Sequence, residues 1–128
     1  MQLCDLSIHE LHDRLKKREI RSLEIVRSVF ARIHRVETKL KAFVTLTEEV
    51  ATEAAKAADQ KIEKQKEFPP LLGIPIALKD IFLTRGIKTT CGSKILENYI
   101  PPYNATTVDR IHTEGGVLVG KLNMDEFA

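Results

Sequence analysis

Apolar residues recur at helical spacing through the first half of the chain. Ser7 to Glu10 has the form of a capping box and predicts a helix over residues 7–18. The longest apolar stripe predicts a helix over residues 22–38, with Ser22 expected as its N-cap. An alanine- and charge-rich stretch predicts a third helix over residues 47–66. The residues expected to face the core are Val26, Val29, Phe30, Ile33 and Val36 in the second helix and Ala51, Ala54, Ala55, Ala58 and Ile62 in the third.

Short apolar runs in other parts of the chain predict strands. Residues 74–78 (IPIAL) and 117–123 (VLVGKLN) are strand candidates, and residues 41–46 (KAFVTL) form either a short strand or an extended link. Because side chains alternate across a strand, Ile74, Ile76 and Leu78 should share one face, and Pro75, Ala77 and Lys79 the other.

A fourth helix is predicted between the last two strand candidates. Asn104 or Thr106 should cap it, Val108 and Ile111 should point inward, and Gly115-Gly116 should end it after about Glu114. A strand, a long connection, a helix and a second strand are typical of an α/β fold. We therefore expect an α/β protein.

The domain organisation follows from a break in the middle of the chain. Residues 68–73 (FPPLLG) interrupt the helical pattern with two prolines and a glycine. They separate a helical part, residues 1–68, from an α/β part, residues 69–128. With 128 residues, the chain is long enough for one modest domain.

The charge pattern gives no electrostatic case for direct nucleic-acid binding. Twenty basic and eighteen acidic residues leave a net charge of +2, and the two signs alternate along the helices without a clustered basic face. Cys4 and Cys91 form no disulfide framework, which favours reduced thiols in the cytoplasm. The N-terminus lacks the apolar core of a signal peptide, and no uncharged apolar run approaches the roughly 18 residues of a membrane span.

Most familiar catalytic and metal-binding motifs are missing from the sequence. It has no phosphate-binding loop, dinucleotide fingerprint, zinc-protease motif or serine elbow. His9 and His12 lie three residues apart, but no third ligand is placed for a metal ion. Cys91 has no identifiable base, and His34 is expected at the rim of its helix. No metal or cofactor site is therefore predicted in this chain.

Lys79 is the remaining candidate for chemistry. Lysine is a poor base at neutral pH, because its reference pKa is about 10.4. Burial disfavours the charged ammonium and lowers that pKa, so a partly buried lysine at the end of an apolar strand could serve as a neutral base. Spacing alone favours a solvated strand end over a catalytic base.

Four phrases of the sequence carry a resemblance to a known family. They are GIPIALKD at residues 73–80, TTCGSKILENY at 89–99, PPYNATTVDR at 101–110 and GKLNMDEFA at 120–128. The chain resembles the amidase signature family over residues 72–128, and more loosely over its N-terminal helices. Within that family it is most similar to the A subunits of the glutamyl-tRNA(Gln)/aspartyl-tRNA(Asn) amidotransferases. The resemblance implies N-terminal helices followed by the first strands of a mixed β-sheet flanked by helices, an incomplete amidase signature domain.

The resemblance implies a role for Lys79. It would be the general base of a Ser–cis-Ser–Lys triad that hydrolyses glutamine through an acyl-enzyme and releases ammonia. Both serines are expected beyond Ala128, so neither Ser22 nor Ser93 is assigned to the triad. The chain is accordingly expected to be an N-terminal fragment that is inactive alone, and marginally stable because its sheet edges are exposed.

Partners are implied by the same resemblance. The chain's parent would assemble with subunits B and C in a heterotrimer and bind tRNA only indirectly, through the B subunit. ATP and Mg²⁺ would act at that partner, which would convert Glu-tRNA(Gln) to Gln-tRNA(Gln), Asp-tRNA(Asn) to Asn-tRNA(Asn), or both. Two alternatives remain: another amidase-signature hydrolase of small amides, and a non-catalytic truncated module that binds the partner subunits.

Overall fold

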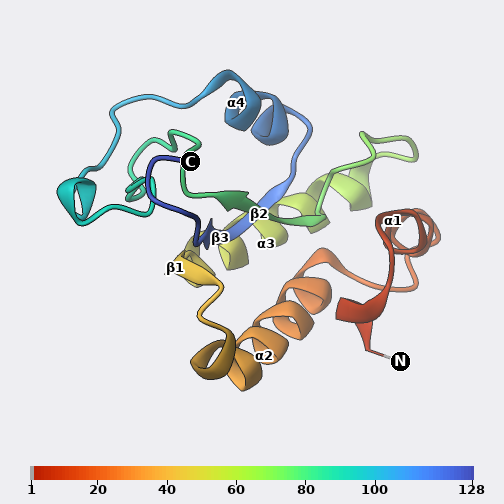
Figure 1. Ribbon diagram of the computed structural model, residues 1–128. Coiled ribbons are helices and arrows are strands. Elements are labelled where there is room, and N and C mark those ends of the chain that lie inside the picture. The colour runs from red at the N-terminus through yellow and green to blue at the C-terminus, as the bar shows by residue number, and fades with distance from the viewer. Residues whose placement is uncertain (1) are drawn as a thin grey trace.

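A computed structural model of the chain describes residues 2–128, with helices on both sides of a small sheet (Figure 1). The predicted α/β class is confirmed. The elements in chain order are η1 (Leu3–Asp5), α1 (Ile8–Lys16), α2 (Ser22–Leu40), β1 (Phe43–Leu46), α3 (Glu48–Lys64), β2 (Pro75–Lys79), η2 (Lys94–Leu96), α4 (Thr106–Thr113) and β3 (Val117–Leu122), where η denotes a 3₁₀ helix.

The helices form where the apolar spacing predicts them, but two of the predicted caps are wrong. Ser7 does cap α1, since its Oγ accepts the Glu10 N–H, while the Glu10 carboxylate accepts the Ser7 N–H at 2.8 Å. Ser22 is not the cap of α2; that residue is Arg21. Ser22 is fully buried, and its Oγ donates a 2.7 Å hydrogen bond to the carbonyl oxygen of Gly73. A tertiary contact thus replaces the expected local one.

The cap of α4 differs from the prediction in a similar way. Ala105 is the N-cap residue, and its side chain cannot bond the helix end. Asn104 instead accepts the Arg85 N–H at 2.6 Å and donates to the Asp109 carboxylate at 2.9 Å. Its amide group therefore ties the start of α4 to the loop after β2.

The three strands form one mixed sheet in the order β1-β3-β2. The central strand β3 pairs antiparallel with β1 and parallel with β2. Parallel pairing requires a crossover, and residues 80–116, which include η2 and α4, provide it. The short strand expected within residues 41–46 is confirmed as β1.

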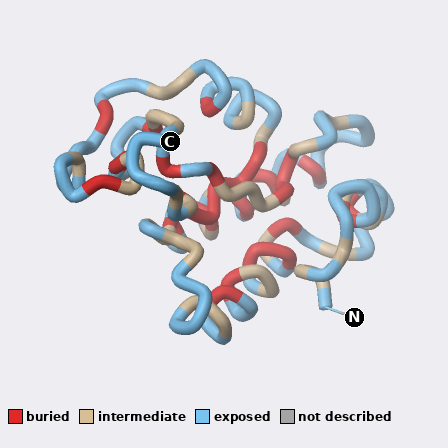
Figure 2. Tube along the Cα trace, viewed as in Figure 1, coloured by how far each residue is buried: buried red, intermediate tan, exposed pale blue. Residues whose placement is uncertain are grey.

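Helices cover both faces of the sheet. Val117 and Val119 of β3 pack against α2 and α3, whereas Leu118 packs with Leu78 and with Val108 of α4. Figure 1 shows α4 on one side of the strands and α2 and α3 on the other. Figure 2 shows buried residues along the strands and on the sheet-facing sides of α2 and α3. The core is therefore a three-layer sandwich with β3 at its centre.

A β-bulge interrupts the alternation of side chains along β3. Opposite β2, Ile76 pairs with Leu118, but the next residue, Ala77, pairs with Gly120 and leaves Val119 as the extra residue. A bulge resets which face the following side chains occupy. Lys121 consequently pairs with Leu78, on the α4 side of the sheet, instead of continuing the Val117 and Val119 series.

Candidate active site

Lys79 is the last residue of β2, as the sequence predicts. Its neighbours Leu78 and Asp80 are both buried, yet Lys79 itself is exposed. The expected partial burial of this amine is therefore not supplied by residues 2–128. The backbone on either side is well fixed, since the Lys79 carbonyl accepts the Phe82 N–H at 3.1 Å.

Asp80 is the centre of a buried polar network next to Lys79. The residue has 0% exposure, and its N–H continues the sheet by donating to the Leu122 carbonyl at 3.0 Å. One carboxylate oxygen, Oδ2, accepts hydrogen bonds from the N–H of Thr90, at 3.0 Å, and from the Thr90 hydroxyl. The other, Oδ1, lies 3.3 Å from Nζ of Lys121.

Lys121 is the second buried charge of this network. Its side chain has 0% exposure, and Nζ donates to the Phe82 carbonyl and to the Thr89 hydroxyl, both at 2.9 Å. Burial lowers the pKa of Lys121, and the neighbouring Asp80 carboxylate opposes that shift. Nζ therefore makes two hydrogen bonds and an ion pair with Asp80, whose Oδ1 accepts no hydrogen bond from residues 2–128.

The roles of Asp80 and Lys121 were not predicted from the sequence. A charged residue in the apolar run VLVGKL is the one signal that could have drawn attention to Lys121. Its partners lie on segments distant in sequence, and only the bulge brings Lys121 to them. Strict alternation would have placed this lysine on the α2 and α3 side of the sheet.

The loop of residues 90–93 folds over Asp80. Cys91 donates its N–H to the Asp80 carbonyl at 3.0 Å, and its carbonyl accepts the Phe127 N–H at 2.9 Å. Cys91 and Gly92 both adopt left-handed backbone conformations, with φ of 52° and 66°. A side chain at Gly92 would meet the Met124 carbonyl oxygen at 2.6 Å, so the loop needs glycine there.

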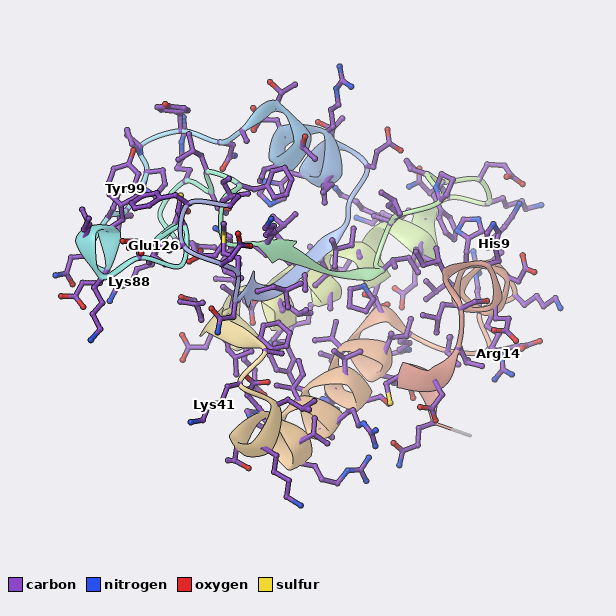
Figure 3. All side chains as sticks on the ribbon, in the orientation of Figure 1. His9, Arg14, Lys41, Lys88, Tyr99 and Glu126 are labelled. Atoms are coloured by element: carbon purple, nitrogen blue, oxygen red, sulfur yellow. The ribbon has the colours of Figure 1, made fainter. Side chains whose placement is uncertain are left out.

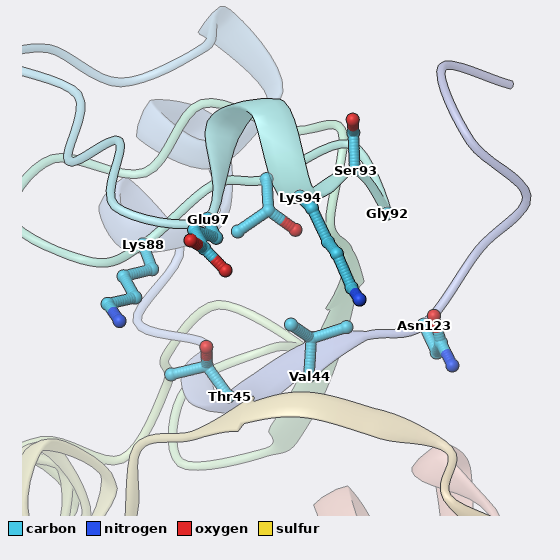
Figure 4. Close-up of a pocket in the computed structure, with 9 residues that line it drawn as sticks. Val44, Thr45, Lys88, Gly92, Ser93, Lys94, Glu97 and Asn123 are labelled. Atoms are coloured by element: carbon cyan, nitrogen blue, oxygen red, sulfur yellow. The ribbon is translucent and has the colours of Figure 1, made fainter.

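A hollow of about 290 Å³ opens between this loop and β1 (Figure 4). Lys94 reaches across it toward Val44, and Asn123 lies at its edge. Thr90 belongs both to the lining of the hollow and to the Asp80 network. Polar groups from β1, from the loop and from Asn123 just after β3 therefore meet in this hollow, and Thr90 links it to the Asp80 network.

The two serines that were not assigned to a triad have structural hydrogen bonds. Ser93 is buried, and its Oγ donates to the Glu126 carboxylate at 2.7 Å and accepts the Ile95 N–H at 3.2 Å. Ser22 bonds to Gly73, at the opposite end of β2 from Lys79. Cys91 is a free, partly buried cysteine.

Within the part of the chain that the structure describes, the histidines are not grouped with other metal ligands. His34 pairs with the Glu48 carboxylate at 2.8 Å on the surface, in agreement with the predicted rim position. His9 lies at the end of the molecule far from Glu126 (Figure 3). Between residues 2 and 128, no group of three or more His, Cys, Asp or Glu side chains is placed to hold a metal ion. The helices of this part of the chain include none long and apolar enough to cross a membrane.

Known proteins resemble the chain over its full length. Residues 24–128 match the Amidase family. Proteins named as the A subunit of glutamyl-tRNA(Gln) amidotransferase are 56% identical in Geobacter metallireducens and 54% identical in Thermoanaerobacter pseudethanolicus, in each case over all 128 residues. The chain spans only 26% of the length of each of these curated relatives.

Solved structures share the fold. The native peptide amidase of Stenotrophomonas maltophilia matches 95% of this chain with a TM-score of 0.88 and 28% identity, and the match covers 25% of that enzyme. A protein from a vestigial complex linked to the origins of an s-triazine catabolic enzyme matches 96% of the chain with a TM-score of 0.91 and 32% identity, over 27% of its own length. With most of its residues matched to the Amidase family, the chain belongs to the amidase signature family.

Proposed function

We propose that this chain is part of the glutamine-hydrolysing A subunit of a tRNA-dependent amidotransferase. The observation that carries the proposal is the 56% identity, over all 128 residues, to a protein named as the A subunit of glutamyl-tRNA(Gln) amidotransferase. The likeness to the peptide amidase is much weaker, at 28% identity. Identity of this extent favours the amidotransferase over another amide hydrolase.

In the proposed reaction, the Lys79 amine is the base of a Ser–cis-Ser–Lys triad. It takes a proton from a bridging serine, which activates the nucleophilic serine for attack on the side-chain amide of glutamine. The products are an acyl-enzyme and ammonia, and water then releases glutamate. Both serines belong to parts of the enzyme outside residues 1–128. The exposure of Lys79 fits this arrangement, because its amine is free to meet groups from those parts.

The ammonia is proposed to reach a partner in a heterotrimer with subunits B and C. There, ATP and Mg²⁺ would activate Glu-tRNA(Gln), Asp-tRNA(Asn) or both for amidation. The assignment of the metal and nucleotide to the partner follows from the proposed identity of the chain as part of an A subunit. A cytoplasmic location is part of the same proposal.

The test is an assay of the full-length protein in complex with its partners. We expect glutamine hydrolysis that forms Gln-tRNA(Gln) or Asn-tRNA(Asn), and little hydrolysis of simple peptide amides. Efficient turnover of those amides without tRNA would favour another amidase-signature hydrolase. A complex that forms but hydrolyses neither kind of amide would favour a non-catalytic module.

A further inference from the structure

We propose that the buried Asp80–Lys121 pair positions the Lys79 amine for its work as a base. The inference rests on the proposed function, since it concerns how the proposed base is held. Neither Asp80 nor Lys121 is exposed to touch a substrate, so both would act through Lys79. A catalytic group held loosely loses much of its effect, because proton transfer needs donor and acceptor within hydrogen-bond reach.

Asp80 fixes the chain immediately after Lys79 at several points. Its N–H and C=O bond to Leu122 and Cys91, each at 3.0 Å, and its carboxylate bonds to Thr90 and pairs with Lys121. These contacts tie one residue to β3 and to the loop of residues 90–93. The backbone from which Lys79 projects therefore has little freedom to rotate.

Lys121 completes this arrangement from the neighbouring strand. Its Nζ reaches the Phe82 carbonyl, the Thr89 hydroxyl and Asp80, and so connects β3 to three points of the segment that follows β2. Lys121 is itself a poor candidate for the base. Its amine has 0% exposure, donates two hydrogen bonds at 2.9 Å and is paired with the Asp80 carboxylate 3.3 Å away.

The bulge in β3 supports a specific role for the pair. A regular strand would point Lys121 away from Asp80, whereas the extra residue at Val119 turns it toward the Lys79 end of β2. A buried ion pair contributes little net stability compared with apolar residues of similar size. The bulge places the buried Lys121 amine next to the segment that carries Lys79. Positioning of Lys79 explains this arrangement better than a gain in stability does.

The test uses Asp80→Asn in the full-length protein, in complex with its partners. This change keeps the shape of the side chain and removes its charge. We expect kcat for glutamine-dependent amidation to fall at least about tenfold, with KM for glutamine and the ammonia-dependent rate each within about twofold. A loss confined to kcat would show that the base is misplaced while substrate binding and the partner site are intact.

Ser22→Ala is the matched control. It removes a different fully buried hydrogen bond, at the opposite end of β2, and should lower the melting temperature without lowering kcat. If Asp80→Asn does not fold, Thr90→Val replaces it. That variant removes the hydroxyl bond to Asp80, keeps both charges, and should lower kcat about threefold or more.

Two results would overturn the positioning role. The first is a kcat within about twofold of wild type in the folded Asp80→Asn variant, or in Thr90→Val if that variant replaces it. The second is a parallel fall of the glutamine-dependent and ammonia-dependent rates. Lys79→Ala is measured in parallel to separate the two proposals. If Lys79→Ala retains glutamine-dependent activity, the proposed function of Lys79 fails. If it loses that activity while the network variants keep theirs, only the positioning role fails.

Discussion

Lys121 is a charged residue in a place where charge is costly. It has 0% exposure, and burial lowers its pKa even though the Asp80 carboxylate lies 3.3 Å away. Desolvation therefore outweighs the attraction of the pair. A lysine whose pKa is lower in the folded protein than in the unfolded chain binds fewer protons when folded. Stability must then rise with pH between the folded and unfolded pKa values.

This sign gives a prediction for Lys121→Met in the full-length protein. Loss of one partner from a buried pair should destabilise the protein by about 3 to 5 kcal/mol near neutral pH. The stability difference, wild type minus variant, should grow as the pH rises toward 10.5, the ordinary pKa of lysine, because only wild type gains stability from residue 121. Denaturation midpoints at several alkaline pH values measure this, and a difference that shrinks in that range would contradict it.

At the residue scale, the sequence points to Lys79 as the candidate residue but does not predict the buried contacts of the neighbouring Asp80. Lys79 stands out because an apolar run ends in it. The contacts of Asp80 with Thr90 and Lys121 cannot be read in the same way, because they depend on how a long crossover returns to the sheet. The burial expected for Lys79 depends on surroundings that residues 2–128 do not supply.

At the scale of elements, apolar periodicity predicts the helices and strands well, because a helix or strand that buries one face repeats its apolar residues with the period of that element. Capping depends on single hydrogen bonds, which a tertiary contact can replace. Ser22 and Asn104 bond to Gly73 and to Arg85 and do not cap the helices α2 and α4. The only sequence signal for the bulge in β3 is a glycine within an apolar strand. Gly120 lies so close to β1 that an added Cβ would stand 2.6 Å from the Thr45 carbonyl oxygen.

Gly120→Ala should therefore push β1 away from β3. We expect a loss of about 1 to 3 kcal/mol, the usual range for overpacking, with faster hydrogen exchange at the β1 amides. Gly86→Ala is the control, because a side chain there meets nothing within 4 Å and only the positive φ is strained. Equal exchange at β1 in the two variants would show that the close approach at Gly120 is unimportant.

At the scale of the molecule, the described sheet has only three strands, and β1 and β2 each lack a strand partner on their outer side among residues 2–128. Lys79 is at the end of one of these outer strands. The curated relatives are about four times as long, since the chain spans 26% of them. In our proposal, the base therefore lies in this chain and the groups it serves lie elsewhere in the full-length protein.

The most direct test of that proposal is Lys79→Ala in the full-length protein, in complex with its partners and assayed with two nitrogen donors. Glutamine-dependent amidation of tRNA should fall at least about a hundredfold, the usual lower range for loss of a general base. Amidation with added ammonia should continue at the wild-type rate, because free ammonia bypasses glutamine hydrolysis. Equal loss with both donors would mean that Lys79 maintains the structure of the complex, and retention of both would mean that it takes no part in the reaction.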